Sequence, residues 1–118
     1  MSKLAKALSG AAGSAGGDPL YVEDVFSTYL YTGTGSSNPI NNGIDLSGEG
    51  GLVWGKRRNL GNSHWLINTV NGIASRLESD GTGAATDKST SFTSFNSNGF
   101  TVATGDNEFN NANGTYAS

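Results

Sequence analysis

The chain of 118 residues contains no cysteine, a single histidine and only two prolines. Without cysteine it cannot form a disulfide or a thiolate metal site, and His64 alone cannot make a multi-histidine metal site within one copy. No apolar run approaches the roughly 20 residues that a membrane-spanning helix needs. Because the chain has no cysteine, its sequence does not indicate whether it works in an oxidising or a reducing compartment. These absences predict a protein with no cofactor, no bound metal and no membrane insertion.

Charge is also scarce, since only 14% of the residues are charged and the formal net charge is -3. Few charges argue against a charge-rich disordered tail. Net acidity with one compact basic cluster argues against nucleic acid, which usually selects a broad positive face. The apolar content of 35% is low for an autonomous core. We therefore expect one small domain whose stability depends on neighbouring chains or on further sequence.

Turn-forming residues dominate what is present. There are 18 glycines, and with serine, threonine and asparagine they make up nearly half of the chain. Short β-prone runs lie between them, and Asn71-Gly72 is a strong two-residue hairpin signal. Strands at this spacing without helices between them predict an antiparallel sandwich, with 80–91 and 105–114 as long surface loops. The expected strands are Val25–Thr32, Ile44–Leu46, Leu52–Lys56, Trp65–Val70, Ile73–Leu77, Ser91–Phe95 and Phe100–Thr104.

The first residues differ in character from the rest. Two lysines followed by small residues superficially suggest a signal peptide, but an apolar centre is missing and Gly10 interrupts it, so we expect the mature chain to retain the segment. It is either a flexible tail or a peptide that orders only when docked on a partner. We divide the chain into an extended or short-helical arm at 1–19 and a β domain at 20–118.

The stretch GGLVWGKR, residues 50–57, nearly matches a phosphate-binding loop. The hydroxyl that such a loop needs after its lysine is replaced by Arg57. Leu52-Val53-Trp54 is an apolar, β-prone run, and no helix-forming segment follows Lys56. A strand is the better interpretation, and nucleotide binding is rejected.

From Asp24 onward the chain resembles the concanavalin A-like (LamG-type) domain of marine bacteriophage tail-fibre and other virion proteins. Such domains usually carry an apolar residue where Gly55 stands, and they continue beyond the position of the last residues here. The resemblance therefore implies an all-β, partial antiparallel β-sandwich of jelly-roll kind. The matching stretches are DVFSTYLYTGTG (24–35), INNGIDLSGEGGLVWGKRRN (40–59), SHWLINTVNG (63–72) and TSFNSNGFTVATGDNEFNNANGTYAS (93–118).

The resemblance implies a structural protein of the bacteriophage virion, a tail-fibre or fibre-like component located in the tail that contributes to host attachment. Its N-terminal arm would dock on other tail proteins (adaptor, nozzle or portal-proximal) through Lys3, Leu4, Lys6 and Leu8. A host surface glycan is a further expected partner. Half a sandwich would leave apolar groups uncovered, so we expect a homo-oligomer, in phage fibres usually a trimer. The groups expected to be uncovered are Phe26, Leu30, Trp54 and Phe100.

Two other function classes compete. One is a carbohydrate-binding module without catalysis, although Trp54 and Trp65 on apolar strands are more often core than sugar platforms. The other is a glycan hydrolase, which needs two carboxylates on one strand face. Asp45 and Glu49 do not provide that arrangement, and His64 is expected to be a rim residue, so we predict no enzymatic activity.

Two charged clusters remain. Lys56, Arg57 and Arg58 are either a solvated strand end or a patch for an anionic ligand. The oxygens of 106–108 could coordinate calcium, but three such residues in one loop are too common to indicate a site.

Overall fold

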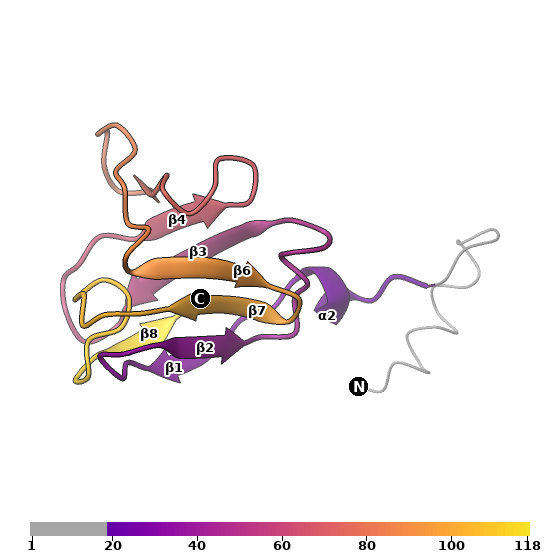
Figure 1. The fold of residues 1–118 in the computed structure, drawn as a ribbon, viewed down its shortest axis with the longest axis horizontal. Coiled ribbons are helices and arrows are strands. Elements are labelled where there is room, and N and C mark those ends of the chain that lie inside the picture. The colour runs from indigo at the N-terminus through magenta and orange to yellow at the C-terminus, as the bar shows by residue number, and fades with distance from the viewer. Residues whose placement is uncertain (1–18) are drawn as a thin grey trace.

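The computed structural model describes residues 19–118, and Figure 1 shows their path. The predicted docking residues Lys3, Leu4, Lys6 and Leu8 lie outside the described residues. The described chain forms one short helix and eight strands in two antiparallel sheets, which confirms the all-β prediction. The elements are α2 (Val22–Val25), β1 (Leu30–Thr32), β2 (Asn38–Asn41), β3 (Leu52–Arg57), β4 (Trp65–Asn68), β5 (Leu77–Glu78), β6 (Phe92–Asn96), β7 (Gly99–Val102) and β8 (Thr115–Ala117).

The larger sheet has the order β1-β8-β3-β4-β5 and the smaller one β2-β7-β6. Along β3, Val53, Gly55 and Arg57 are buried while Leu52 and Trp54 are exposed, so one face points inward and the other outward. The helix is too short to span a membrane, and no other helix occurs within 19–118.

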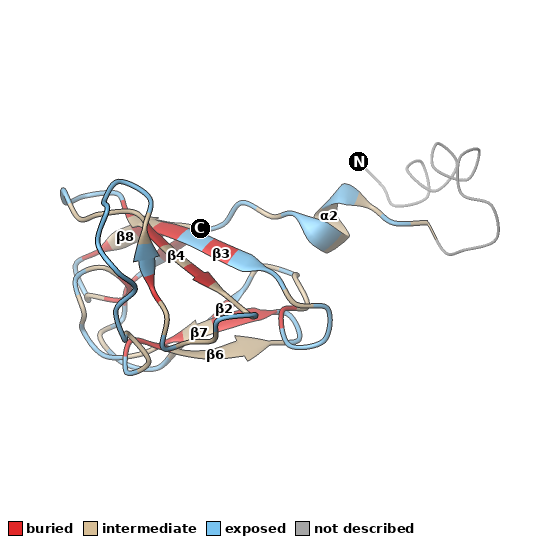
Figure 2. Cartoon of the chain, turned by 90° about the horizontal axis from the view of Figure 1, so that it is seen from above, coloured by how far each residue is buried: buried red, intermediate tan, exposed pale blue. Residues whose placement is uncertain are grey.

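The core lies between the two sheets (Figure 2). The ring of Phe92 stacks on Phe100 with centroids 5.3 Å apart, and Trp65 meets their edges at 6.0 and 6.3 Å. Phe100 is fully buried, so the prediction that it would be uncovered is wrong, because the larger sheet covers it. The buried apolar residues are Tyr31, Ile40, Leu46, Val53, Trp65, Ile67, Phe92, Phe100, Val102, Phe109 and Tyr116.

Gly55 provides the space that the indole of Trp65 fills. The two residues are cross-strand partners, and a Cβ at Gly55 would overlap the six-membered ring of Trp65. Gly55 is therefore matched to a fully buried tryptophan on the neighbouring strand.

The expected strand Val25–Thr32 is wrong over its first half. The Asp24 carboxylate accepts a hydrogen bond from the N–H of Tyr21 at 3.2 Å, and the N–H of Phe26 bonds to the carbonyl of Val22 at 2.8 Å, closing one helical turn. The ladder with β8 pairs only Leu30–Thr32. β propensity alone cannot extend a strand beyond its hydrogen-bonding partner.

Side-chain hydrogen bonds also replace two other expected elements. At the end of β4, the side chain of Asn68 accepts hydrogen bonds from the N–H groups of Val70 and Asn71. This Asx-type turn opens the β4–β5 connection well beyond the predicted two-residue hairpin. The expected strand Ile44–Leu46 is likewise a turn, because Asp45 accepts the N–H of Gly48 at 2.7 Å.

Residues 105–114 form a loop, as their composition predicted, but part of this loop is buried and not on the surface. Phe109 and Asn110 are fully buried. Three core side chains donate to the carbonyl groups of this segment: Tyr31 to Phe109 at 2.9 Å, Trp65 to Glu108 at 3.0 Å and Tyr116 to Asn107 at 3.0 Å. The segment therefore closes one end of the core, and it leads into β8 in the interior of the larger sheet.

Candidate functional site

The outward side of the larger sheet carries a row of apolar side chains. The strand register places Leu30 beside Ala117, and Trp54 beside Leu66, which in turn lies beside Leu77. Lys56 is also paired with Ala117. The exposed fractions are 62% for Leu30, 58% for Leu52 and 54% for Trp54. We call this surface the outer face, and it consists of Leu30, Leu52, Trp54, Lys56, Leu66, Leu77 and Ala117.

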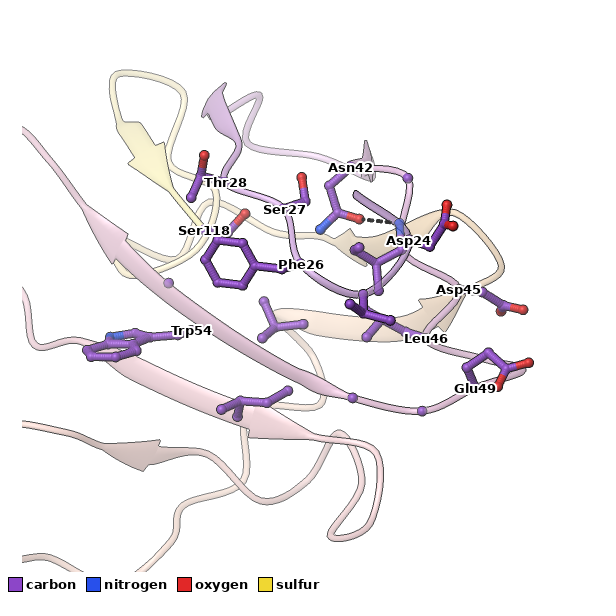
Figure 3. A pocket seen from close by; sticks show the side chains of 18 of the residues that line it. Asp24, Phe26, Ser27, Thr28, Asn42, Asp45, Leu46, Glu49, Trp54 and Ser118 are labelled. Atoms are coloured by element: carbon purple, nitrogen blue, oxygen red, sulfur yellow. Dashed lines mark hydrogen bonds between the residues drawn. The ribbon is translucent and has the colours of Figure 1, made fainter. Parts of the chain in front are cut away.

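A groove of about 1120 Å³ opens on the outer face along β3. Residues 20–28 form one wall and residues 42–51 another. In Figure 3, Phe26 and Trp54 come to this groove from different parts of the chain, with Asp45 and Glu49 at its far end. The groove therefore combines an aromatic floor with acidic groups at its rim.

Trp54 is held in place by its indole N–H. This group donates to Nδ1 of His64 at 3.1 Å, and the two rings meet nearly edge-on with centroids 5.9 Å apart. The backbone N–H of His64 bonds in turn to Asp80 at 3.0 Å. Trp65 is buried, as predicted. The prediction that Trp54 belongs to the core is wrong, because inward and outward side chains alternate along β3 and Trp54 points outward.

Asp80 keeps its negative charge beside this pair. Desolvation would raise the pKa of Asp80, but hydrogen bonds from its own backbone N–H and that of His64 outweigh it and lower the pKa. His64 is half-buried and acts as the link between Asp80 and Trp54.

The cations of the 56–58 cluster do not share one surface. Arg57 is only 4% exposed, bonds to the side chains of Asn59 and Asn107, and lies over the ring of Tyr116. Lys56 lies on the outer face, where its ammonium donates to the carbonyl of Leu60 at 2.8 Å. Arg58 is exposed. The interpretation of a solvated strand end therefore fails for Arg57, which the strand alternation turns inward.

A partly buried ionic cluster around Arg76 was not predicted. The Arg76 guanidinium binds both carboxylate oxygens of Glu108 and reaches Glu78 at 2.6 Å. Lys88 lies 3.2 Å from Asp106. These residues come from distant parts of the chain, and no local sequence signal indicates their meeting.

Desolvation would raise the pKa of Asp106, but the hydrogen bond from the N–H of Glu108 and the ion pair with Lys88 outweigh it and lower the pKa. The oxygens considered for calcium thus face cations: Asp106 faces Lys88, Glu108 faces Arg76, and the side-chain oxygen of Asn107 accepts from Arg57. Residues 19–118 contain no cluster of three acidic, histidine or cysteine side chains placed to hold a metal ion.

The two carboxylates considered for hydrolysis lie in one turn. Asp45 caps it by accepting the N–H of Gly48, and Glu49 is exposed at its end. Both line the groove, but neither is on a strand.

Comparison with known proteins identifies a family without assigning an activity. No curated protein and no solved structure matches the chain. Residues 22–118 match the model of a family described as a domain of unknown function, DUF7483. Since the match covers most of the chain, the protein belongs to the DUF7483 family.

Proposed function

We propose that the protein is a structural component of a bacteriophage virion, a tail-fibre or fibre-like subunit that assembles with copies of itself and contributes to host attachment. The observation that carries the assembly role is the outer face, where Leu30, Leu52 and Trp54 each expose more than half of their surface. Exposed apolar patches of this kind mark interaction surfaces in soluble proteins. The virion assignment rests on the resemblance of residues 24–118 to phage fibre domains.

In this proposal the sandwich is the N-terminal part of a LamG-type fold. The arm at 1–19 docks on an adaptor, nozzle or portal-proximal protein of the tail, and the β domain forms a homotrimer. Of the 56–58 cluster, Arg58 is exposed and Lys56 is half-buried, and in this proposal these two cations meet an anionic host glycan. No enzymatic step is assigned, because the turn carboxylates Asp45 and Glu49 lack the strand-borne pairing that sandwich glycosidases use.

The location is tested by immunogold electron microscopy. Antibodies raised against the purified chain are applied to particles of the phage whose genome encodes it, with preimmune serum as the control. We expect label on the tail. A lack of label on intact and disrupted particles, together with no peptide of the chain in their mass spectra, would overturn the virion assignment.

A carbohydrate-binding module is the second candidate, and one observation favours it. The ring of Trp54 is exposed and held by His64 in a groove with an acidic rim, an arrangement that lets a sugar stack on the aromatic face. Isothermal titration with host-surface polysaccharide tests it. Trp54→Ala should abolish binding, while Val70→Ala, at an exposed site near the start of the β4–β5 connection, should leave it unchanged.

A further inference from the structure

A hydrogen bond to one imidazole fixes the polar edge of the exposed tryptophan on the outer face. The indole N–H of Trp54 donates to Nδ1 of His64 at 3.1 Å. Trp54 is 54% exposed, so packing restrains its ring on one side while solvent covers the other. Both residues line the groove along β3, where Figure 3 shows the ring of Trp54. The position of this ring therefore depends on the state of His64.

The bond requires one protonation state of His64. An indole N–H can donate a hydrogen bond but cannot accept one, so Nδ1 must offer its lone pair. This requires a neutral imidazole whose proton is on Nε2. When the imidazole is protonated, both of its nitrogens carry hydrogens, and the new N–H at Nδ1 points at the N–H of Trp54. Two donors that face each other repel, so protonation breaks the bond.

The protonated ring would also face the wrong part of the indole. The two rings meet at an interplanar angle of 64°, with their centroids 5.9 Å apart. The hydrogen bond places the imidazole at the N–H edge of Trp54. The edge of an aromatic ring is its positive part, and it is the face that attracts a cation. An imidazolium at this edge is therefore repelled and not held.

The charged groups on the neighbouring elements are Asp80, Glu78 and Lys56. Asp80 follows β5, keeps its negative charge and accepts the backbone N–H of His64 at 3.0 Å. Glu78 on β5 is bound to Arg76, and the ammonium of Lys56 on β3 is bound to a backbone carbonyl. Asp80 thus supplies a counter-charge for an imidazolium, which helps His64 to exist in its charged form.

We propose that the neutral imidazole of His64 positions Trp54 on the outer face, and that protonation of His64 releases the indole. The chain has one histidine and no cysteine, and histidine is the side chain that ordinarily changes its charge between pH 8 and pH 5. The release does not depend on a ligand. Its consequence rests on the second candidate function, carbohydrate binding: a sugar stacks on a fixed ring at pH 8 and on a released one at pH 5.

The release is tested without a ligand by NMR of the isotope-labelled full chain, whose two tryptophans give two indole N–H resonances. The resonance of Trp54 should move upfield between pH 8 and pH 5, because an N–H proton loses its downfield shift when its hydrogen bond breaks. Trp65 is the internal control. Its ring is fully buried and donates to the carbonyl of Glu108, so its resonance should stay in place.

Two substitutions at His64 separate the hydrogen bond from the titration. In His64→Asn, the side-chain carbonyl oxygen replaces Nδ1 with an acceptor that does not titrate, so the Trp54 resonance should stay downfield at both pH values. In His64→Leu no acceptor remains on this side chain, so the resonance should stay upfield at both. The two variants thus remove the pH response at opposite ends, which a general loss of structure does not do.

The consequence for binding is tested by repeating the polysaccharide titration at both pH values. The affinity of the wild type should fall by about two- to tenfold from pH 8 to pH 5, the equivalent of one hydrogen bond. The affinity of His64→Asn should change less with pH. Val70→Ala, at an exposed site outside the groove, is the matched control and should show the fall of the wild type.

Three results would overturn the inference. These are a Trp54 resonance that does not move with pH, an equal movement of this resonance in His64→Asn, and polysaccharide binding by the wild type that is equally strong at both pH values. If the resonance moves as expected in a chain that binds no polysaccharide at either pH, the release is supported and the carbohydrate-binding function alone is contradicted.

Discussion

Single residues in this sandwich are constrained by their neighbours across the sheet. Gly55 illustrates this, because the indole of Trp65 occupies the space above its Cα. The glycine and the tryptophan therefore form one packing unit.

Gly55→Ala should therefore destabilise the fold by about 1–3 kcal/mol, the usual range for overpacking a tight core. Urea unfolding followed by circular dichroism measures the change. Gly83→Ala is the matched control, since a methyl group there meets nothing within 4 Å, and it should change stability little. Equal stabilities of the two variants would contradict the packing role.

Asp106 should make stability depend on pH in the acid range. Its pKa is lowered in the folded protein, where the Glu108 N–H and Lys88 outweigh its desolvation, so its stabilisation is complete above the unfolded pKa of about 3.9. The stabilisation is lost as pH falls from that value through the lower folded pKa. Thermal unfolding from pH 6 to pH 2 should show a smaller acid loss in Asp106→Asn than in the wild type. If the unfolding temperatures of the wild type and Asp106→Asn fell identically with pH, a contribution of Asp106 to acid stability would be excluded.

At the scale of elements, residues 105–114 form no helix or strand, and they contribute to the fold through hydrogen bonds of their buried part. The fully buried amide of Asn110 accepts hydrogen bonds from the N–H of Thr34 at 2.9 Å and from the side chain of Asn38 at 3.1 Å, and it donates to the carbonyl of Ser36. One side chain thereby joins the end of the core to the β1–β2 connection.

Asn110→Ala should cost roughly 2–3 kcal/mol, because it leaves several polar groups of the β1–β2 connection without their partner. The unfolding free energy in urea measures this, and faster hydrogen exchange at Thr34 should accompany it. Asn113→Ala, on an exposed residue of the same segment, is the control. If Asn113→Ala lowered the unfolding free energy and Asn110→Ala did not, the segment would not be anchored through Asn110.

At the scale of the whole molecule, the two tryptophans report on opposite sides of the larger sheet. Trp65 is fully buried and Trp54 is 54% exposed. Acrylamide quenching should therefore resolve one protected and one accessible indole in dilute protein. If the outer face is covered on assembly, raising the protein concentration should protect the accessible indole.

Trp54→Phe provides the control for this measurement, since its remaining indole should be protected at every concentration. Quenching of the wild type that does not change with concentration, while sedimentation shows an oligomer, would place the interface away from the outer face.

The sequence by itself determined the all-β class and several strands. The cores of β3, β4, β6 and β7 lie within predicted strands, because alternating apolar residues between turn formers are a local property of the chain. The predicted exposure of Phe26, Leu30 and Trp54 is also confirmed. For Trp54, the competing expectation of a place in the core is wrong.

Only the tertiary structure decided which strands have partners and which polar groups meet. The run Val25–Thr32 has strand propensity throughout, yet only Leu30–Thr32 pairs with β8. The composition of 105–114 is that of a surface loop, yet Tyr31, Trp65 and Tyr116 hold its carbonyl groups from inside the core. The ion pair between Arg76 and Glu108 joins residues 32 positions apart. Hydrogen bonds and burial of this kind depend on segments distant in sequence, and so no local pattern could indicate them.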